Sequence, residues 1–423
     1  MPKMMTHSAR VGILALTTRR ATTPGRALRP SPKSRFPTRS RVPATLLAGL
    51  ALASTAGAPG AVRAQAASPA PQARTVRVTA GPIRATPPYV TVEEVAESTW
   101  VLRAGTANVV AALTAEGWVL VDTGTRAEAI ALRGEVQRLA TRPIVAVFNT
   151  HFHDDHAGGN AVYRGMGVPV YASRAARRLE QQIRPRMEQG APREAARLEA
   201  CAAATPPGPD HDRAVSFYEF LARWWREGAA DAARDPQFVV AADRAFDRRL
   251  LLRVGGLAID ARSFGRGAHS EGDAVVAFPS RRVVALGDIA VRGGAPWADQ
   301  YMGGGSIEGV LAAQDTLAAW LAGAWGAAPG DSAWRLVPGH GTVLRVGEFA
   351  ADRVALGQLR ACARQAYLAG RAREVAAADC AGVGFPGAGG AYAVWLFDEE
   401  WRRPASRTPG STRAPARRPL TKP

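Results

Sequence analysis

Five of the six residues in the segment HFHDDH, at positions 151–156, carry side chains that can bind a metal ion. Residues two apart on an extended or turning segment point the same way, so His151 and His153 can share one ion. Asp155 and His156 then face a neighbouring position. Two glycines, Gly158 and Gly159, follow after one alanine and let the backbone turn closely, as a crowded ligand loop requires. The segment therefore predicts a metal-binding loop.

Such a loop needs further ligands from distant parts of the chain. Two histidines stand at Gly-rich turns after apolar segments: His269 in the sequence GAHS and His340 in the sequence PGHG. Asp288 ends the apolar segment VALGD, where a charge is costly unless a metal or hydrogen bonds satisfy it. Asp122, in VLVDTG, is placed in the same way. Each of these residues alone is typical of an ordinary turn, and the loop makes them candidate partners.

Hydrophobic periodicity indicates the elements that position the loop. Short strands are expected at 99–102, 108–113 and 118–121, and three consecutive short strands favour an antiparallel start. A helix over 126–140 leads to an apolar strand at 144–148, and the loop follows that strand immediately. Ligand crevices form at the C-terminal ends of strands in open α/β sheets, so this placement favours a functional site.

The second half of the chain repeats the pattern of a run of strands followed by a helix. Strands are expected at 250–254, 274–278 and 283–286, then a helix over 307–321 and a strand at 336–337. The candidate partners of the loop stand next to these elements.

Between the two halves, residues 174–233 are rich in Ala, Arg and Glu and predict a helical insertion. Its aromatic residues are spaced as on a helix: Phe217, Tyr218, Phe220, Trp224 and Trp225. Aromatic residues at this spacing usually mark a buried face, so packing of the insertion is the favoured interpretation. A cover over the site is the alternative.

The formal net charge of +18 lies in the two ends of the chain. Residues 1–66 and 402–423 contain Lys and Arg but no Asp or Glu, and together they account for the whole excess. Residues 67–401 are therefore balanced, and without a basic stripe in the part that can fold, no nucleic-acid partner is expected. The tail, 402–423, is rich in Pro, Arg and Ser and is expected to be disordered.

Residues 1–66 have the pattern of a secretory leader. Basic residues precede an apolar run at 44–53, and the small-residue sequence AQA at 64–66 is typical of a cleavage site. The run is shorter than the roughly 18 apolar residues that a membrane span requires. The expectation is an exported protein, periplasmic or extracellular, without a stable membrane anchor, whose residues 67–90 form a linker.

Three cysteines remain, at 201, 362 and 380. In an oxidising compartment one pair can form a disulfide, and Cys362 and Cys380 are the closest in sequence. None of the three has the spacing of a metal ligand. Burial as small apolar side chains is therefore favoured over a catalytic role.

The order of these motifs resembles that of the metallo-β-lactamase superfamily over roughly residues 90–348. The resemblance rests on Asp122, the loop at 151–156, His269, Asp288 and His340. It implies an α+β fold, a four-layer αββα sandwich, spanning 91–348. A helical extension over 349–401 would follow it.

The resemblance also implies the arrangement of a dinuclear site. The first metal would be held by His151, His153 and His269 and the second by Asp155, His156 and His340. Asp288 would bridge both metals. Asp122 would orient the loop without binding a metal.

Two divalent cations about 3.5–4 Å apart can share a water, lower its pKa and supply a hydroxide nucleophile at neutral pH. Asp155, near that water, would orient it or accept its proton and is the candidate catalytic residue. Zinc is the default for a ligand set of nitrogen and oxygen, although iron and manganese accept similar ligands. The expected activity is hydrolysis of a small ester, thioester, amide or lactam.

Three alternatives stay open. A β-lactamase proper is less favoured because Asp288 stands where the exported lactamases with a cysteine ligand carry that Cys, and the set is more similar to that of glyoxalase II. An iron-dependent sulfur dioxygenase-like enzyme would use the same fold for redox chemistry. A metal-binding accessory protein would bind without turnover. The Gly-rich segment 301–308 is similar to exported hydrolases of unassigned substrate, but a turn that ends with Ser306 capping a helix explains it more simply.

Overall fold

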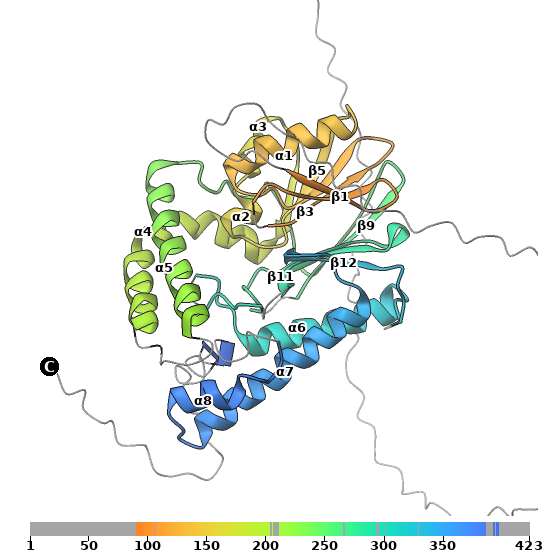
Figure 1. Cartoon of the computed structure of the whole chain (residues 1–423). Helices are drawn as coiled ribbons and strands as arrows, with labels where there is room; N and C mark the ends of the chain where they lie inside the picture. Colours follow the sequence, from red (N-terminus) through yellow and green to blue (C-terminus); the bar gives the residue numbers. More distant parts are fainter. Residues whose placement is uncertain are drawn as a thin grey trace, which may run out of the picture. The chain divides into compact units, whose positions relative to one another are not determined.

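Two β-sheets packed face to face form the centre of the protein (Figure 1). The computed structural model describes residues 90–105, 107–203, 205, 211–264, 267–292, 296–300, 302–328, 330–385, 392–393 and 395–396. The expected leader at 1–66, the linker apart from Val90, and the tail at 402–423 lie outside the described residues.

The first sheet has seven strands in chain order: β1 (Thr91–Ala96), β2 (Thr99–Arg103), β3 (Val109–Leu113), β4 (Trp118–Val121), β5 (Ile144–Phe148), β6 (Val170–Ser173) and β7 (Arg244–Phe246). The pairs from β1 to β4 are antiparallel, which confirms the antiparallel start expected from the sequence. From β4 to β7 the pairs are parallel, so the C-terminal ends of β4 and β5 meet at one edge of the sheet.

The second sheet has five strands in the order β12-β11-β10-β9-β8. Their bounds are β8 (Arg249–Val254), β9 (Leu257–Ser263), β10 (Ala274–Phe278), β11 (Val283–Val291) and β12 (Arg335–His340). Only β11 and β12 are parallel among these strands. Four of the five were expected from the sequence, but not β9, which carries Asp260, Arg262 and Ser263 among its apolar residues.

Strand β4 shows how alternation builds the layers. Val119 and Val121 point into the core between the two sheets, whereas Trp118 and Leu120 point to the opposite face and pack beneath a helix. All four side chains are buried. A strand covered on both faces becomes a continuous apolar run, which made this element recognisable in the sequence.

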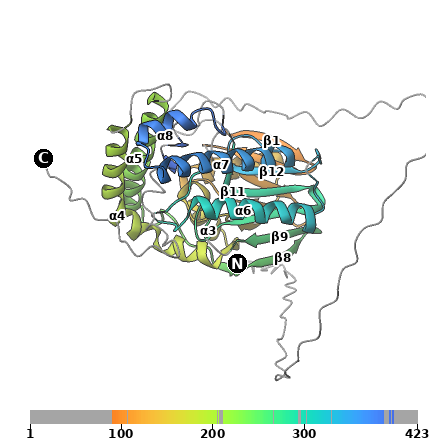
Figure 2. The same ribbon diagram turned by 90° about the horizontal axis from the view of Figure 1, so that it is seen from below.

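Helices cover the outer face of each sheet. On the first sheet lie α1 (Arg126–Leu139) and α3 (Asn160–Gly165), and on the second lie α6 (Ile307–Ala319) and α7 (Val346–Leu368) (Figure 2). The fold is therefore α+β, with the four-layer αββα order expected. The boundary expected at residue 348 falls inside α7, whose Phe349 still packs on the second sheet.

The expected insertion is a pair of helices, α4 (Arg174–Ala203) and α5 (His211–Arg234). The two helices pack along each other and share an apolar core with Tyr218 and Trp225 from α5 and Met187 from α4. These buried aromatic side chains confirm the packing interpretation for part of the aromatic set.

The last described helix, α8 (Arg373–Cys380), is joined to α7 by a disulfide between Cys362 and Cys380, with Cα atoms 5.9 Å apart. This is the pair that the sequence analysis named. Within the described ranges, no helix combines the length and apolar character that crossing a membrane requires.

Candidate metal centre

The loop at 151–156 follows β5 at the edge between the two sheets. His153 is the N-cap of the short helix α2 (Asp154–Ala157), and this turn brings Asp155 and His156 round to the side of His151. The backbone then passes close to β4: a Cβ on Gly159 would lie 2.8 Å from the carbonyl oxygen of Thr123. The Gly-Gly pair is therefore required by close approach, as predicted.

The second sheet supplies the distant partners. His269 lies in the turn between β9 and β10, and His340 ends β12. Asp288 lies within β11 rather than at its end, because the strand continues to Val291 past a register shift at Gly287. Gly339 passes so close that a Cβ there would collide with Asp288 Oδ1.

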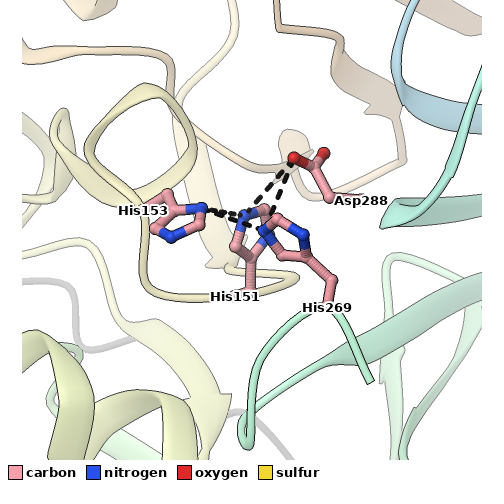
Figure 3. Close-up of side chains that lie close together, drawn as sticks. All are labelled: His151, His153, His269 and Asp288. Carbon is pink, nitrogen blue, oxygen red and sulfur yellow. Dashed lines mark hydrogen bonds and ion pairs between the residues drawn. The ribbon is translucent and has the colours of Figure 1, made fainter. Parts of the chain in front are cut away.

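Three imidazoles and one carboxylate form the first of two clusters (Figure 3). We call His151, His153 and His269 the buried group, because their exposed fractions are only 1–3%. His153 Nδ1 lies 3.1 Å from His151 Nε2 and 3.0 Å from His269 Nε2. Asp288 Oδ2 lies 3.6 Å from His269 Nε2 and 3.9 Å from His151 Nε2.

Asp155, His156 and His340 form the second cluster, which we call the open group because the side chains of Asp155 and His340 are each 24% exposed. His340 Nε2 lies 3.4 Å from both His156 Nε2 and Asp155 Oδ2. Asp288 approaches this group too, with Oδ1 3.3 Å from His156 Nε2 and Oδ2 3.4 Å from His340 Nε2. The seven candidate ligands named from the sequence thus come together, with Asp288 between the two groups.

Hydrogen bonds fix which ring nitrogens face the interior. His153 Nε2 lies 3.0 Å from Asp299 Oδ2, and His269 Nδ1 lies 2.7 Å from the Trp297 carbonyl oxygen. Carboxylate and carbonyl oxygens only accept, so these ring nitrogens carry the protons. When His153 is neutral, the lone pairs of its Nδ1 and of His269 Nε2 are therefore directed at each other.

Asp122 orients two more rings. Its Oδ2 accepts hydrogen bonds from His156 Nδ1 at 2.9 Å and from the Thr150 hydroxyl at 2.8 Å. Because that hydroxyl donates to Asp122, it accepts from His151 Nδ1 at 3.0 Å. Asp122 holds a left-handed backbone with φ 64°, which non-glycine residues rarely adopt. The supporting role expected for Asp122 agrees with these contacts.

The buried group fits a metal ion. Unprotonated nitrogens about 3 Å apart repel one another unless a cation lies between them. Two nitrogens bound at about 2.0 Å to one tetrahedral ion lie about 3.3 Å apart. The separations of 3.0–3.1 Å within the buried group are close to that value.

His151 and His269 of the buried group differ from His340 of the open group in their affinity for protons, whereas Asp299 raises the pKa of His153 against the effect of burial. Burial lowers the pKa of His269 to about 4 and also lowers that of His151. Burial acts the same way on His340, but the charges of Asp288 and Asp155 outweigh it and raise the pKa of His340 to about 9. Although burial would raise the pKa of Asp288, the surrounding imidazoles, His340 first, hold it well below its usual range.

The sequence analysis did not identify Asp299 or Trp297. Both lie in a loop between β11 and α6, where no periodicity marks a residue as buried. The only available signal was the Gly-rich segment that begins at residue 301. That segment does contain the expected cap, since Ser306 Oγ accepts from Gly309 N at the start of α6.

A cavity of about 470 Å³ opens beside the open group. Asp155, Asp288 and His340 line it, together with Trp224 from α5 and Trp297. The clusters are thus accessible to a small molecule from this side.

The fold and site define a four-layer α+β protein with histidine and aspartate clusters of metal-binding type at the edge between its sheets. The family model "Metallo-beta-lactamase superfamily" matches residues 101–340, more than half of the chain. The chain therefore belongs to the metallo-β-lactamase superfamily, as the sequence motifs predicted.

One solved structure with a TM-score above 0.5 agrees with this fold. A double mutant of the sec-alkyl sulfatase PisA1 is 18% identical, with a TM-score of 0.51, over 75% of this chain and 51% of that one. A metallo-beta-lactamase from Pontibacter korlensis is 17% identical, with a TM-score of 0.42, over 63% of this chain and 99% of that one. At these identities the likeness concerns the fold alone.

Proposed function

We propose that this protein is a metal-dependent hydrolase that binds two divalent cations, one in each group, and cleaves a small ester, thioester, amide or lactam. The observation that carries this proposal is the position of Asp288, whose carboxylate lies 3.3–3.9 Å from ring nitrogens of both groups. A carboxylate between two ligand sets can bridge a pair of cations. Membership of the superfamily supports the same reaction class.

The residues have distinct roles in this proposal. His151, His153 and His269 would hold one cation, Asp155, His156 and His340 the other, and Asp288 both. Two such cations lower the pKa of a coordinated water and polarise a carbonyl oxygen. The ligand set of nitrogen and oxygen makes zinc the first metal to test, with iron and manganese next.

Asp155 is the proposed catalytic residue. Its side chain faces the cavity, and its Oδ2 lies 3.4 Å from His340 Nε2 and 3.6 Å from His156 Nε2. A carboxylate in this position can orient an attacking water and accept its proton. The Trp297 ring stacks against the His153 ring, with ring centroids 5.9 Å apart. In this position it would limit the access of further water from that side.

The test is hydrolysis of a substrate panel by the metal-loaded full chain. The panel contains a thioester, a lactone, an aryl ester, nitrocefin and a phosphodiester. We expect turnover of at least one acyl substrate, loss of that turnover in His153→Ala, and retention in His211→Ala, which removes a histidine outside the clusters. Oxygen consumption without hydrolysis would instead identify a redox enzyme, and inactivity on every acyl substrate after loading with zinc, iron or manganese would contradict the proposal.

A further inference from the structure

Four aromatic side chains line the cavity beside the candidate metal centre. We call Phe220, Trp224, Trp297 and Tyr392 the aromatic wall. The Trp224 ring lies 5.8 Å from the His153 ring and 6.3 Å from the Trp297 ring, and it meets both nearly edge to face. The wall therefore forms an apolar corner next to the buried group.

Helix α5 contributes two aromatic side chains to the wall. Tyr218 and Trp225 are only 1% exposed and lie within the insertion core. Phe220 and Trp224, four residues apart and so on one helical face, line the cavity, and Trp224 also packs against the insertion core. Phe220 is 51% exposed, so packing of the insertion does not account for it. Packing thus accounts for Tyr218 and Trp225, whereas Phe220 and Trp224 also border the cavity.

The cavity has no Lys or Arg among its described lining residues. Its acidic members are Glu128, Asp154, Asp155 and Asp288, and burial raises the pKa of Asp154 to about 7. Two bound divalent cations would more than offset the charges of Asp155 and Asp288, whereas the carboxylate of Glu128 would oppose an anionic group placed beside it, away from the metals. Recognition of a carboxylate, sulfate or phosphate normally uses Arg or Lys at the recognising end.

We infer that this cavity binds an acyl compound with an uncharged, ring-bearing group, which packs against the aromatic wall while the reacting carbonyl faces Asp288 and His340. This inference rests on the proposed hydrolase function and names its substrate class. Aromatic pairs prefer edge-to-face or offset contacts with centroids about 4.5–7 Å apart, and a ring entering the corner of Trp224 and Trp297 can make both kinds.

Three p-nitrophenyl esters that differ only at the far end of the acyl chain test the charge preference. The 4-phenylbutyrate ester carries a neutral ring, the glutarate monoester a carboxylate, and the 4-(trimethylammonio)butyrate ester a quaternary ammonium group, which cannot attack the ester carbonyl. We expect kcat/KM for the phenyl ester to exceed that of either charged ester by about tenfold or more. An equal or higher value for a charged ester would overturn the inference.

Variants of the aromatic wall test whether the ring of the substrate binds there. Trp224→Ala should reduce kcat/KM for the phenyl ester by about tenfold and that for p-nitrophenyl acetate by less than about threefold. Phe220→Lys, at a half-exposed position, should shift the preference toward the glutarate ester. Leu368→Ala removes an exposed apolar side chain of α7 outside the cavity. It should change kcat/KM neither for the phenyl ester nor for p-nitrophenyl acetate. Unchanged preferences in both wall variants would overturn the inference.

A binding experiment separates this inference from the proposed function. Tryptophan fluorescence can follow binding of 4-phenylbutyramide, a neutral amide, and of 4-phenylbutyrate, its anionic counterpart. Tighter binding of the amide, weakened in Phe220→Ser, would support the wall even if no ester were hydrolysed. Hydrolysis without discrimination between the phenyl and glutarate esters would agree with the hydrolase proposal but would contradict binding of the substrate ring at the aromatic wall.

Discussion

The buried group and the open group use similar ligands in different surroundings. Each imidazole of the buried group is held by a hydrogen bond from its outer nitrogen, and the whole group is shielded from solvent. In the open group, Asp155 and His340 border the cavity and are partly exposed. The difference suggests a division of work in which the buried group anchors a cation and the open group meets water and substrate.

Removing one histidine from each group is the strongest way to test that division. His269→Ala should lower kcat by more than about 100-fold, because even residues that only orient metal ligands change activity by about 10–100-fold. It should also reduce the bound metal, measured by mass spectrometry of the full chain. His340→Ala should lose the cation of the open group and keep that of the buried group. Retention of both metals in both variants would contradict the division.

Acidification should release the two cations at different pH values. His340, with a pKa raised to about 9 by Asp288 and Asp155 against the effect of burial, is protonated at neutral pH in the metal-free protein. A cation must therefore displace a proton there, and its affinity should fall as the pH decreases below 9. His269, with a pKa lowered to about 4 by burial, offers no such competition at neutral pH. As the pH is lowered from 8 to 5, the open-group cation should be lost first, and measurements of the metal content per chain should show this loss.

Asp299 tests the hydrogen bond that anchors the buried group. Asp299→Asn keeps the shape of the side chain but removes the charge that supports His153. We expect metal affinity or activity to decrease by about 10–100-fold. The charge of Asp299 also raises the pKa of His153 against the effect of burial, so the variant should lower that pKa, measurable by NMR of the metal-free protein. Asp315→Asn, on the exposed face of α6, is the matched control.

Glu180 shows what burial does to a carboxyl group that no cluster of imidazoles surrounds. Burial raises its pKa to about 7, whereas imidazoles hold that of Asp288 low. Folded Glu180 keeps a proton that the unfolded chain releases near its ordinary pKa of 4.5, so its contribution to stability is present below pH 4.5 and lost as the pH rises through 7.

The corresponding variant should have the smallest effect. Glu180→Gln should gain up to about 3 kcal/mol in free energy of unfolding relative to wild type at pH 8, and no more than a few tenths at pH 4. Denaturant unfolding at the two pH values measures the difference. Glu188→Gln, an exposed position on the same helix, should show no such difference.

Much of the site was predictable because its ligands stand at the ends of continuous apolar strands. The strand at 144–148 and the loop after it share a short stretch of sequence, so local patterns located both. Asp288 was also placed correctly beside the loop, although its strand extends further than the apolar run indicated.

The supporting contacts were not predictable in the same way. The ring of His269 is held by a backbone carbonyl, which no residue type encodes, and that of His153 by Asp299 in an irregular loop. The aromatic residues of α5 show a second limit. Helical spacing placed Tyr218 and Trp225 in a core, but only the contacts with the other elements show that Phe220 and Trp224 line the cavity.

The central claim is that Asp288 joins two cation sites, and metal stoichiometry tests it most directly. Metal-free protein should be dialysed against zinc and, separately, manganese, and the bound metal counted per chain in the wild type, in Asp288→Ala and in Asp315→Ala as the surface control. We expect two equivalents in the wild type and in the control, and weakened binding of both in Asp288→Ala. Two equivalents at unchanged affinity in Asp288→Ala, or no specific binding in the wild type, would contradict it.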